Sequence, residues 1–209
     1  AAENIRFTNA YAACPVCSPT RASILSGKYP ARIGVTDWID SSGKWHPCRG
    51  RLVDAPYTKE LPRSETSIAT ALRNGGYQTW HIGKWHLGGH GAYPEKHGFD
   101  VNIGGCEAGA PGIGGYFSPW KIPALSAVKV PPGTYLTDYL TDEAIRLIGS
   151  RNKDRPFFLN LCHYAVHTPI QAPADLVVKY EAKSRKMDLD KVETVKAGDF
   201  FPMHHKKME

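Results

Sequence analysis

The 209-residue sequence has no apolar run long enough to cross a membrane, and residues 1–25 lack the basic, apolar and small-residue order of a signal peptide. The sequence therefore gives no location. It also has no long run of lysine and arginine, so the formal charge of +6 indicates a generally basic surface, and we expect no nucleic-acid partner. The glycine-rich run at 104–115 contains no Gly-Lys-Ser/Thr, which excludes a P-loop of the NTPase kind.

Cysteine is also scarce, since the chain has five, and only two of them are close together. An odd number leaves at least one cysteine unpaired or modified, and the spacing dictates no disulfide framework. Cys14 and Cys17 form a C-x-x-C pair, which is compatible with a redox-active pair, half of a zinc site, or two small buried residues. The zinc interpretation is weak because Cys48, Cys106 and Cys162 are isolated. The pair alone leaves the choice open.

The residues after Cys17 predict a helix start that suits an oxyanion. Ser18 can cap the helix, and Pro19 is suited to its first turn. A helix N-terminus offers free N–H groups and the positive end of the helix dipole. Arg21 adds a full positive charge and a forked donor one turn further on.

The run Cys-Ser-Pro-Thr-Arg-Ala at 17–22, closed by Leu-Ser-Gly-Lys at 25–28, closely resembles the signature of type I sulfatases. In that family C-x-P-x-R directs oxidation of the cysteine to formylglycine. The resemblance implies that Cys17 becomes an aldehyde whose hydrate has two hydroxyls. One attacks sulfur, and the other later loses its proton so that sulfate is released. The redox interpretation explains neither Pro19 nor Arg21.

A second block with this resemblance follows a predicted strand at 77–82. It is Gly-Lys-Trp-His-Leu-Gly-Gly at 83–89, at the carboxyl end of that strand, where ligands bind in open α/β sheets. Taken alone, a solvated lysine and a loop histidine would be the simpler interpretation. The resemblance implies instead that Lys84 binds sulfate and steadies the hydrate, and that His86 holds or deprotonates the second hydroxyl.

A third block begins with the apolar run 156–163, which predicts a strand buried on both faces. His163 and His167 follow, and Thr168-Pro169 argues against a helical His-x-x-x-His metal pair. The resemblance implies that His167 is the general acid that protonates the leaving alkoxide. We predict His163 as a substrate contact.

The remaining segments complete the prediction. We expect a strand at 3–13 and helices at 64–74, 134–150 and 173–187, with Ser64 or Thr66 capping the first helix and Leu176, Val177 and Tyr180 facing inward in the last. The glycine-rich run is expected to be a flexible loop near the site. Trp38 and His90 are candidate substrate contacts. His-Gly-Phe-Asp at 97–100 resembles a packing motif of the family, so His97 receives no catalytic role.

This order of elements predicts an α/β fold with a mostly parallel sheet and helices on both faces. The resemblance implies an alkaline-phosphatase-like fold. We expect residues 1–209 to form a single partial catalytic domain, truncated at both ends, with long loops at 29–63 and 88–133 and a tail at 188–209.

The resemblance further implies catalytic roles for Cys17, Arg21, Lys84, His86 and His167, and calcium as a cofactor with Cys17, once converted to formylglycine, as the one family ligand in this chain. It also implies a periplasmic, secreted or lysosomal location, a sulfated small molecule or glycan as substrate, and a formylglycine-generating or anaerobic sulfatase-maturing enzyme as partner. Two alternatives to sulfuric ester hydrolysis are a formylglycine-dependent phosphonate or phosphodiester hydrolase and a non-catalytic fragment.

Overall fold

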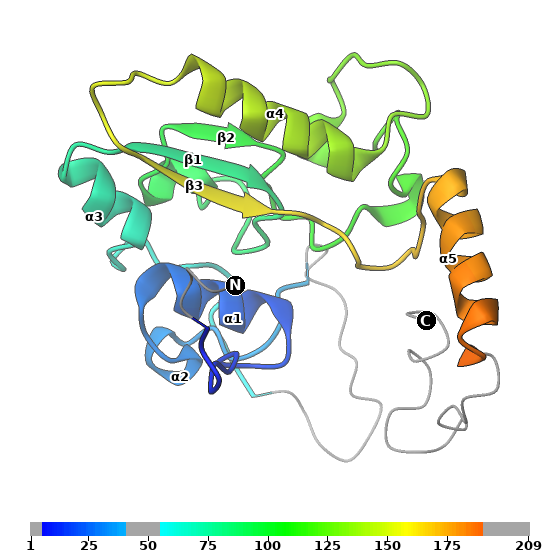
Figure 1. Ribbon diagram of the computed structural model, residues 1–209. Coiled ribbons are helices and arrows are strands. Elements are labelled where there is room, and N and C mark those ends of the chain that lie inside the picture. The colour runs from blue at the N-terminus through cyan, green and yellow to red at the C-terminus, as the bar shows by residue number, and fades with distance from the viewer. Residues whose placement is uncertain (1–5, 41–54, 190–209) are drawn as a thin grey trace.

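A three-stranded parallel sheet lies at the centre of the computed structural model, which describes residues 6–40 and 55–189. Strand β1 (Gln78–Gly83) lies between β2 (Val101–Ile103) and β3 (Phe157–Cys162) (Figure 1). The strand expected at 77–82 and the strand expected within 156–163 are therefore both present, and they are neighbours in the sheet.

The register of the sheet brings the ends of β1 and β3 together. Gly83 pairs with Cys162, the last residue of β3. Just beyond this pair, the Lys84 N–H donates to the Cys162 carbonyl at 2.7 Å. The two segments that carry the predicted lysine and histidines thus leave the sheet from one point.

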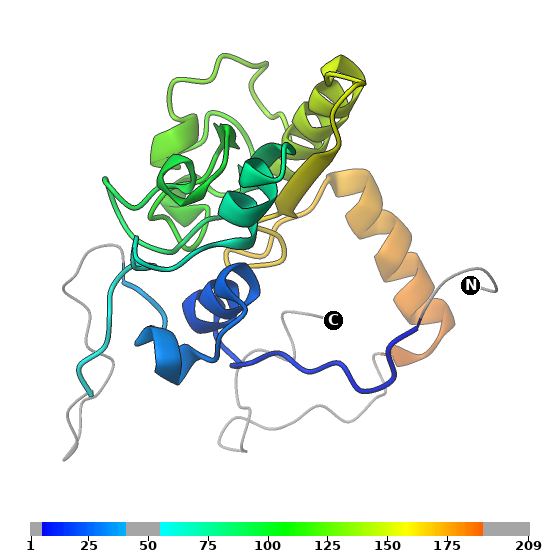
Figure 2. The same cartoon turned by 90° about the vertical axis from the view of Figure 1, so that its left-hand side faces the viewer.

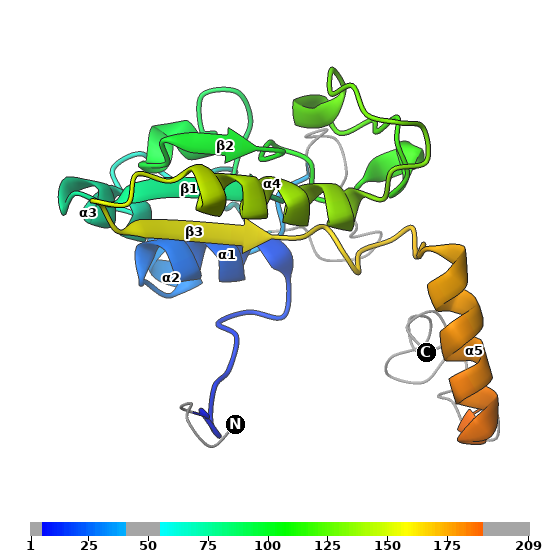
Figure 3. The same cartoon turned by 45° about the horizontal axis from the view of Figure 1, so that its top comes forward.

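Helices cover both faces of the sheet, as Figures 1 and 3 show. One face carries α1 (Cys17–Ser26), α2 (Pro30–Ile33) and α3 (Ile68–Asn74), and the other carries α4 (Leu136–Ser150). A parallel sheet is stable only when both faces are covered in this way. The expected α/β architecture is confirmed.

Two apolar clusters hold these layers to the sheet. The first joins the α1 face to residues after β1 and includes Ala22, Leu25, Trp85, Leu87 and Phe99. The second joins α4 to the sheet and includes Ile82, Tyr116, Trp120, Leu136 and Leu140. Full burial of a leucine-sized side chain contributes roughly 1.5–3 kcal/mol, so these clusters fix the positions of the strand ends.

The strand predicted at 3–13 is not present in its described part, residues 6–13; residues 3–5 lie outside the described ranges. Phe7 and Tyr11 are 79% and 88% exposed. Alternating apolar residues favour a strand only where a neighbouring strand accepts their backbone hydrogen bonds, and no described strand lies beside this segment.

The segment expected as a long loop at 88–133 contains β2 and much of the second apolar cluster. A strand of three residues is too short for alternation to reveal it. The glycine-rich run is partly packed, since Cys106 is 1% exposed while Ile113 is fully exposed. The segment 29–63, also expected to be loop, contains the one-turn helix α2.

Strand β3 was expected to be buried on both faces, and this is wrong. Its residues are half-buried, and Leu161 is 37% exposed. Within the described sheet β3 is an edge strand, so only one of its sides is covered by a neighbour.

Helix α3 begins later than predicted. Ser67 caps it by accepting a hydrogen bond from the Thr70 N–H at 3.0 Å, in place of Ser64 or Thr66. All three residues are acceptable caps, and the choice is made by the Ser67 hydroxyl, which also donates to the His97 carbonyl.

The last helix, α5 (Ala174–Lys186), stands apart from the sheet and its helices (Figures 1, 2 and 3). Leu176, Val177 and Tyr180 were expected to face inward but are 39%, 40% and 56% exposed. The amphipathic pattern predicted the helix correctly, but no other described element covers its apolar side. Of the helices described, none is long and apolar enough to span a bilayer.

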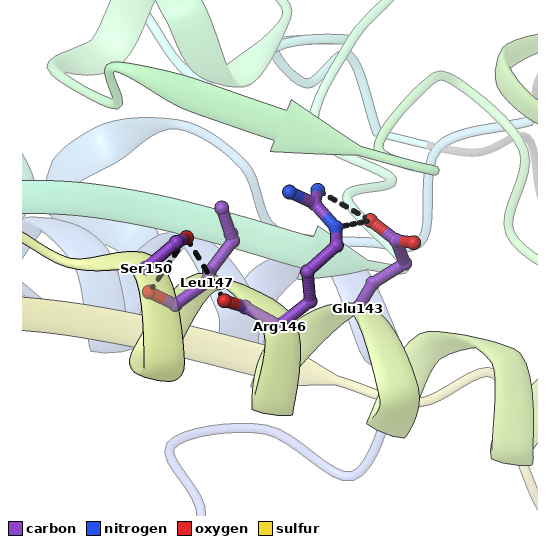
Figure 4. Close-up of polar contacts among 4 residues, drawn as sticks. All are labelled: Glu143, Arg146, Leu147 and Ser150. Carbon is purple, nitrogen blue, oxygen red and sulfur yellow. Dashed lines mark hydrogen bonds and ion pairs between the residues drawn. The ribbon is translucent and has the colours of Figure 1, made fainter.

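The outer side of α4 carries charged and polar side chains together with the exposed Ile145. Arg146 and Glu143 form a surface ion pair with 2.6 Å between Nη2 and Oε2, and the Ser150 hydroxyl donates to the Arg146 and Leu147 carbonyls (Figure 4). A surface pair of this kind contributes only about 0.3–0.5 kcal/mol. The opposite side of the helix, which packs on the sheet, therefore provides most of its stability.

Three histidines are buried in the layers beside β1. Burial lowers the pKa of His81 to about 3 and the pKa values of His86 and His97 to about 4. A histidine whose pKa is lower in the folded state stabilises the fold above its unfolded pKa, near 6.5, and this stability is lost as the pH falls below that value.

We expect the free energy of unfolding to fall by about 2 kcal/mol per buried histidine between pH 7.5 and pH 5. His97→Gln removes one titrating group that has no proposed catalytic role, so its loss over this range should be smaller by about 2 kcal/mol. Urea unfolding followed by tryptophan fluorescence at both pH values measures the difference. An equal loss in parent and variant would contradict the assignment.

Candidate active site

Cys17 is the first residue of α1, so its side chain lies at the positive end of the helix dipole. Val16 is the N-cap residue and makes no side-chain capping bond. The prediction that Ser18 caps the helix is wrong, because its hydroxyl donates to the His86 carbonyl and accepts from the Ile39 N–H, both at 3.0 Å. Ser18 therefore fixes the start of α1 against the segment that carries His86.

Lys84 follows a sharp turn at Gly83. Gly83 has φ +97°, and a Cβ there would lie 2.0 Å from the Cys162 carbonyl oxygen, so only glycine fits. Arg21 donates from Nη1 to the Lys84 carbonyl at 2.7 Å. One arm of the guanidinium thus holds the lysine backbone in place.

His86 is held from three sides in a left-handed backbone conformation with φ +58°. Its N–H donates to the Cys106 carbonyl at 3.0 Å, its carbonyl accepts from Ser18, and its Nε2 bonds to the Ile39 carbonyl. A carbonyl only accepts, so the ring proton is on Nε2, and Nδ1 is an acceptor. Nδ1 is buried and has no partner among the described residues. The Nδ1 of His86 is therefore available to accept a proton.

The side chains of this region are coupled electrostatically. Burial is the main cause that lowers the pKa of Lys84 to about 8; Arg21 lowers it as well, while charge and a hydrogen bond from Cys17 oppose the shift. The pKa of His86 is lowered mainly by burial, and then by Lys84, Arg21 and His167. Lys84 therefore lies within electrostatic reach of Cys17 and Arg21, and His86 within reach of Lys84, Arg21 and His167.

His163 and His167 follow β3 directly. Burial lowers the pKa of His163, whose Nδ1 is buried without a partner among the described residues. His167 is exposed, and its Nδ1 contacts the Thr168 carbonyl at 3.1 Å. The start of α1 and the carboxyl ends of β1 and β3 thus lie in one region of the structure.

The two other candidate contacts differ. Trp38 precedes Ile39, whose carbonyl binds His86, so the backbone of Trp38 lies close to His86. His90 is exposed and packs edge-on near Tyr93, and no described contact joins it to His86. Cys48, the isolated cysteine of the first loop, lies outside the described residues.

A cavity of about 380 Å³ opens beside Cys17, between α1 and β3. Cys17 and Arg21 line it together with apolar side chains such as Ile24 and Leu25, whereas Lys84, His86 and His167 do not.

The described residues do not fit a complete calcium site. Calcium takes roughly six to eight oxygen ligands. Within residues 6–40 and 55–189, no group of three or more His, Cys, Asp or Glu side chains is placed to hold a metal ion. Cys14, Cys17, Cys106 and Cys162 are free thiols. No step of the chemistry below is derived through a metal.

Several residues that build the site were not predicted. The Ile39 carbonyl, the Ser18 hydroxyl and the Tyr116 hydroxyl each form a bond to a site segment at least 20 residues away in sequence. Such contacts leave no local pattern. Gly83 carried a signal, since glycine directly after a strand and before a functional segment indicates a sharp turn or a close backbone approach.

Comparison with known proteins agrees with the geometry. The sulfatase family model matches residues 1–194. The chain is 32% identical to the sulfatase YdeN of Escherichia coli over 82% of this chain and 31% of that protein, and 33% identical to an arylsulfatase of Hemicentrotus pulcherrimus over 84% and 33%.

Among solved structures, the chain resembles BT4656 in complex with its substrate D-glucosamine-2-N,6-O-disulfate, with a TM-score of 0.55 and 27% identity over 84% of this chain and 33% of that protein. The chain spans about a third of the length of the curated relatives it matches. The alkaline-phosphatase-like fold of these structures agrees with the sheet described above. By its motifs, its fold and the extent of the family match, this chain belongs to the sulfatase family.

Proposed function

We propose that this chain provides the nucleophile and the sulfate-binding groups of a sulfuric ester hydrolase, with Cys17 as the precursor of formylglycine. The observation that carries the proposal is the convergence of Cys17 and Arg21 from α1, Lys84 and His86 after β1, and His167 after β3. Two cations near Cys17, with His86 and His167 on segments that leave the sheet at the same edge, suit transfer of a sulfuryl group from a monoanionic ester. This arrangement does not suit thiol–disulfide exchange, which needs no lysine and histidine from distant segments.

Substrate binding depends on the cations. Lys84 is protonated at neutral pH and lies beside Cys17, so it attracts the sulfate oxygens. Arg21 uses one nitrogen for the Lys84 carbonyl and thereby keeps both charges in fixed positions. Preorganised charges need no rearrangement when negative charge moves from sulfur toward the leaving oxygen.

In the proposed first step, one hydroxyl of the residue-17 aldehyde hydrate loses its proton to water and its oxygen attacks sulfur, while the bond from sulfur to the ester oxygen breaks. His167, in its protonated form, gives its proton to the departing alkoxide. The product alcohol leaves, and sulfate remains bound to residue 17 as a hemiacetal ester.

In the proposed second step, the remaining hydroxyl loses its proton and the carbon–oxygen bond to sulfate breaks. His86 is the group suited to take this proton, because it is neutral at working pH and its Nδ1 has no partner among the described residues. Sulfate leaves, the aldehyde is restored, and water hydrates it again.

We propose a sulfated carbohydrate as substrate. The relative BT4656 is described in complex with a sulfated glucosamine, and Trp38, which precedes the Ile39 carbonyl bound by His86, is our candidate for stacking on a sugar face. His163, which directly follows β3, is our second candidate for a contact with the sugar. Calcium, a maturation enzyme that oxidises Cys17, and a periplasmic, secreted or lysosomal location are further proposals that rest on family membership.

The decisive variants are at the two neighbouring cysteines, introduced into the complete protein. Cys17→Ala removes the nucleophile, so hydrolysis of an aryl sulfate should fall by about a thousandfold or more. Cys14→Ser should leave the rate within about twofold, because Cys14 has no role in this chemistry, and it should be active with an intact residue-17 aldehyde.

Mass spectrometry of the peptide that contains residue 17 should reveal an aldehyde in place of the thiol. An active enzyme with an unmodified Cys17 would refute the mechanism, and loss of activity in Cys14→Ser would favour the redox pair. Faster turnover of a matched aryl phosphate diester than of the sulfate would favour the phosphodiesterase alternative. A fully converted protein that cleaves neither ester would indicate a non-catalytic member.

The pH dependence of kcat/KM tests Lys84. Because its pKa is lowered to about 8, the charged form is present below that pH, and activity should fall as the pH rises through it. Conversion of Cys17 to an aldehyde removes a contribution that raises the pKa of Lys84, so the alkaline limb of the kcat/KM profile should lie at or below pH 8. Lys84→Arg keeps its charge, and its alkaline limb should move up by about one unit or more at a reduced rate. An unmoved limb would assign it to another group.

A further inference from the structure

The phenol of Tyr116 is tied to the segment that carries His167. Its hydroxyl lies 2.8 Å from the Tyr164 carbonyl and 2.9 Å from the His167 carbonyl and donates to this pair of acceptors. Its backbone N–H donates to Oε1 of Gln171 at 2.8 Å. We call residues 164–171 the His167 segment. Tyr116 contacts this segment at its beginning, at His167 and at its end.

Tyr116 is itself firmly fixed. Its side chain is 1% exposed and belongs to the apolar cluster under α4. Its carbonyl accepts from the N–H of Leu136, the first residue of α4, at 2.8 Å and from the Trp120 indole at 3.1 Å. Burial raises the pKa of Tyr116 to about 12, so the hydroxyl remains a donor at any working pH.

His167 has little support of its own. Its side chain is exposed, and the hydrogen-bonding contacts described for its ring are with the adjacent Thr168, at 3.1 Å and 3.4 Å. By contrast, His86 is held by Ser18, Ile39 and Cys106. The location of the His167 ring relative to Cys17 therefore depends on the backbone of the His167 segment, and hence on what holds that backbone.

We propose that Tyr116 is a positioning residue that holds His167 on the leaving-group side of the site, so that loss of its hydroxyl slows the cleavage of esters whose leaving group needs a proton. The inference rests on the proposed sulfate ester hydrolysis with His167 as the acid. Tyr116 touches no reacting atom and acts through the backbone of the His167 segment.

The leaving group separates this role from a merely structural one. A sugar alkoxide is a strong base and leaves only with a proton, whereas an activated phenolate such as 4-nitrophenolate leaves without one. General acid catalysis contributes about 100-fold or more, and a misplacement of about 1 Å forfeits much of such a contribution. Damage to the acid therefore appears with poor leaving groups, while general damage to the site lowers all rates equally.

The test uses the complete, aldehyde-bearing protein and a series of aryl sulfates of increasing phenol pKa, together with a sulfated sugar. Tyr116→Phe should reduce kcat for the sugar and the most basic phenols by about 10- to 100-fold and for 4-nitrophenyl sulfate by less than about threefold. The plot of log kcat against leaving-group pKa should steepen, as it should in the benchmark His167→Ala.

The matched control is Tyr93→Phe. Tyr93 packs against the same apolar cluster, and its hydroxyl donates to Glu107 at 2.5 Å, but it makes no described contact with the His167 segment. Its slope should equal that of the parent. If Tyr116→Phe does not fold, Gln171→Leu decides, because it removes the acceptor of the Tyr116 N–H at an exposed position and should steepen the slope as well.

Two results would overturn the inference, and they are distinguishable. A steep slope in His167→Ala with a parent-like slope in folded Tyr116→Phe, or in Gln171→Leu where that variant decides, would leave the proposed function intact and remove the positioning role. A parent enzyme that releases no sulfate from any ester, or a His167→Ala slope equal to the parent slope, would contradict the proposed function or its acid, and the inference would fall with it.

Discussion

The parallel pairing of β1 with β3 is the constraint on which the site depends. Gly83 and Cys162 end the two strands in register, and the Lys84 N–H closes the ladder on the Cys162 carbonyl. Both functional segments therefore begin at one point, although about 80 residues separate them. A side chain on Gly83 would collide with that carbonyl. Glycine at this position therefore permits both the close approach of the two strands and the position of Lys84.

Burial then sets the chemistry of the groups at this edge. Lys84 and His86 lie within a cluster of positive charge and are removed from water, and both effects favour their neutral forms. The lysine keeps its charge at neutral pH because its ordinary pKa is high, whereas the histidine loses it. One environment thus yields a fixed cation and a neutral base, the two properties that binding sulfate and accepting a proton require.

The sequence predicted what local patterns encode. The C-x-P-x-R run, the Gly-Lys-Trp-His block and the histidine before Thr168-Pro169 each indicated a candidate site segment. The β-forming residues at 77–82, the apolar run at 156–163 and the helical spacing at 134–150 indicated β1, β3 and α4. It could not predict the bonds of Ser18 and Tyr116, because a hydroxyl shows no preference among carbonyls that are distant in sequence. It also predicted wrongly that the apolar side of α5 is buried, because an amphipathic pattern indicates a face that can be buried but not which element covers it.

The two sides of the site are built differently, and this bears on how the family can vary. On the proposed sulfate side, Cys17 lies at the start of α1, Lys84 follows the turn at Gly83, and His86 is bonded to Ser18, Ile39 and Cys106. On the proposed leaving-group side, the His167 segment is anchored by Tyr116, by the buried Tyr164, whose hydroxyl donates to the Gly104 carbonyl at 2.9 Å, and by Tyr135, whose hydroxyl donates to the Gln171 carbonyl at 3.3 Å. Sulfate is common to all substrates of such an enzyme, while the alcohol is not. A rigid anion site beside a separately anchored segment lets the alcohol-binding side change without disturbing the groups that hold sulfur.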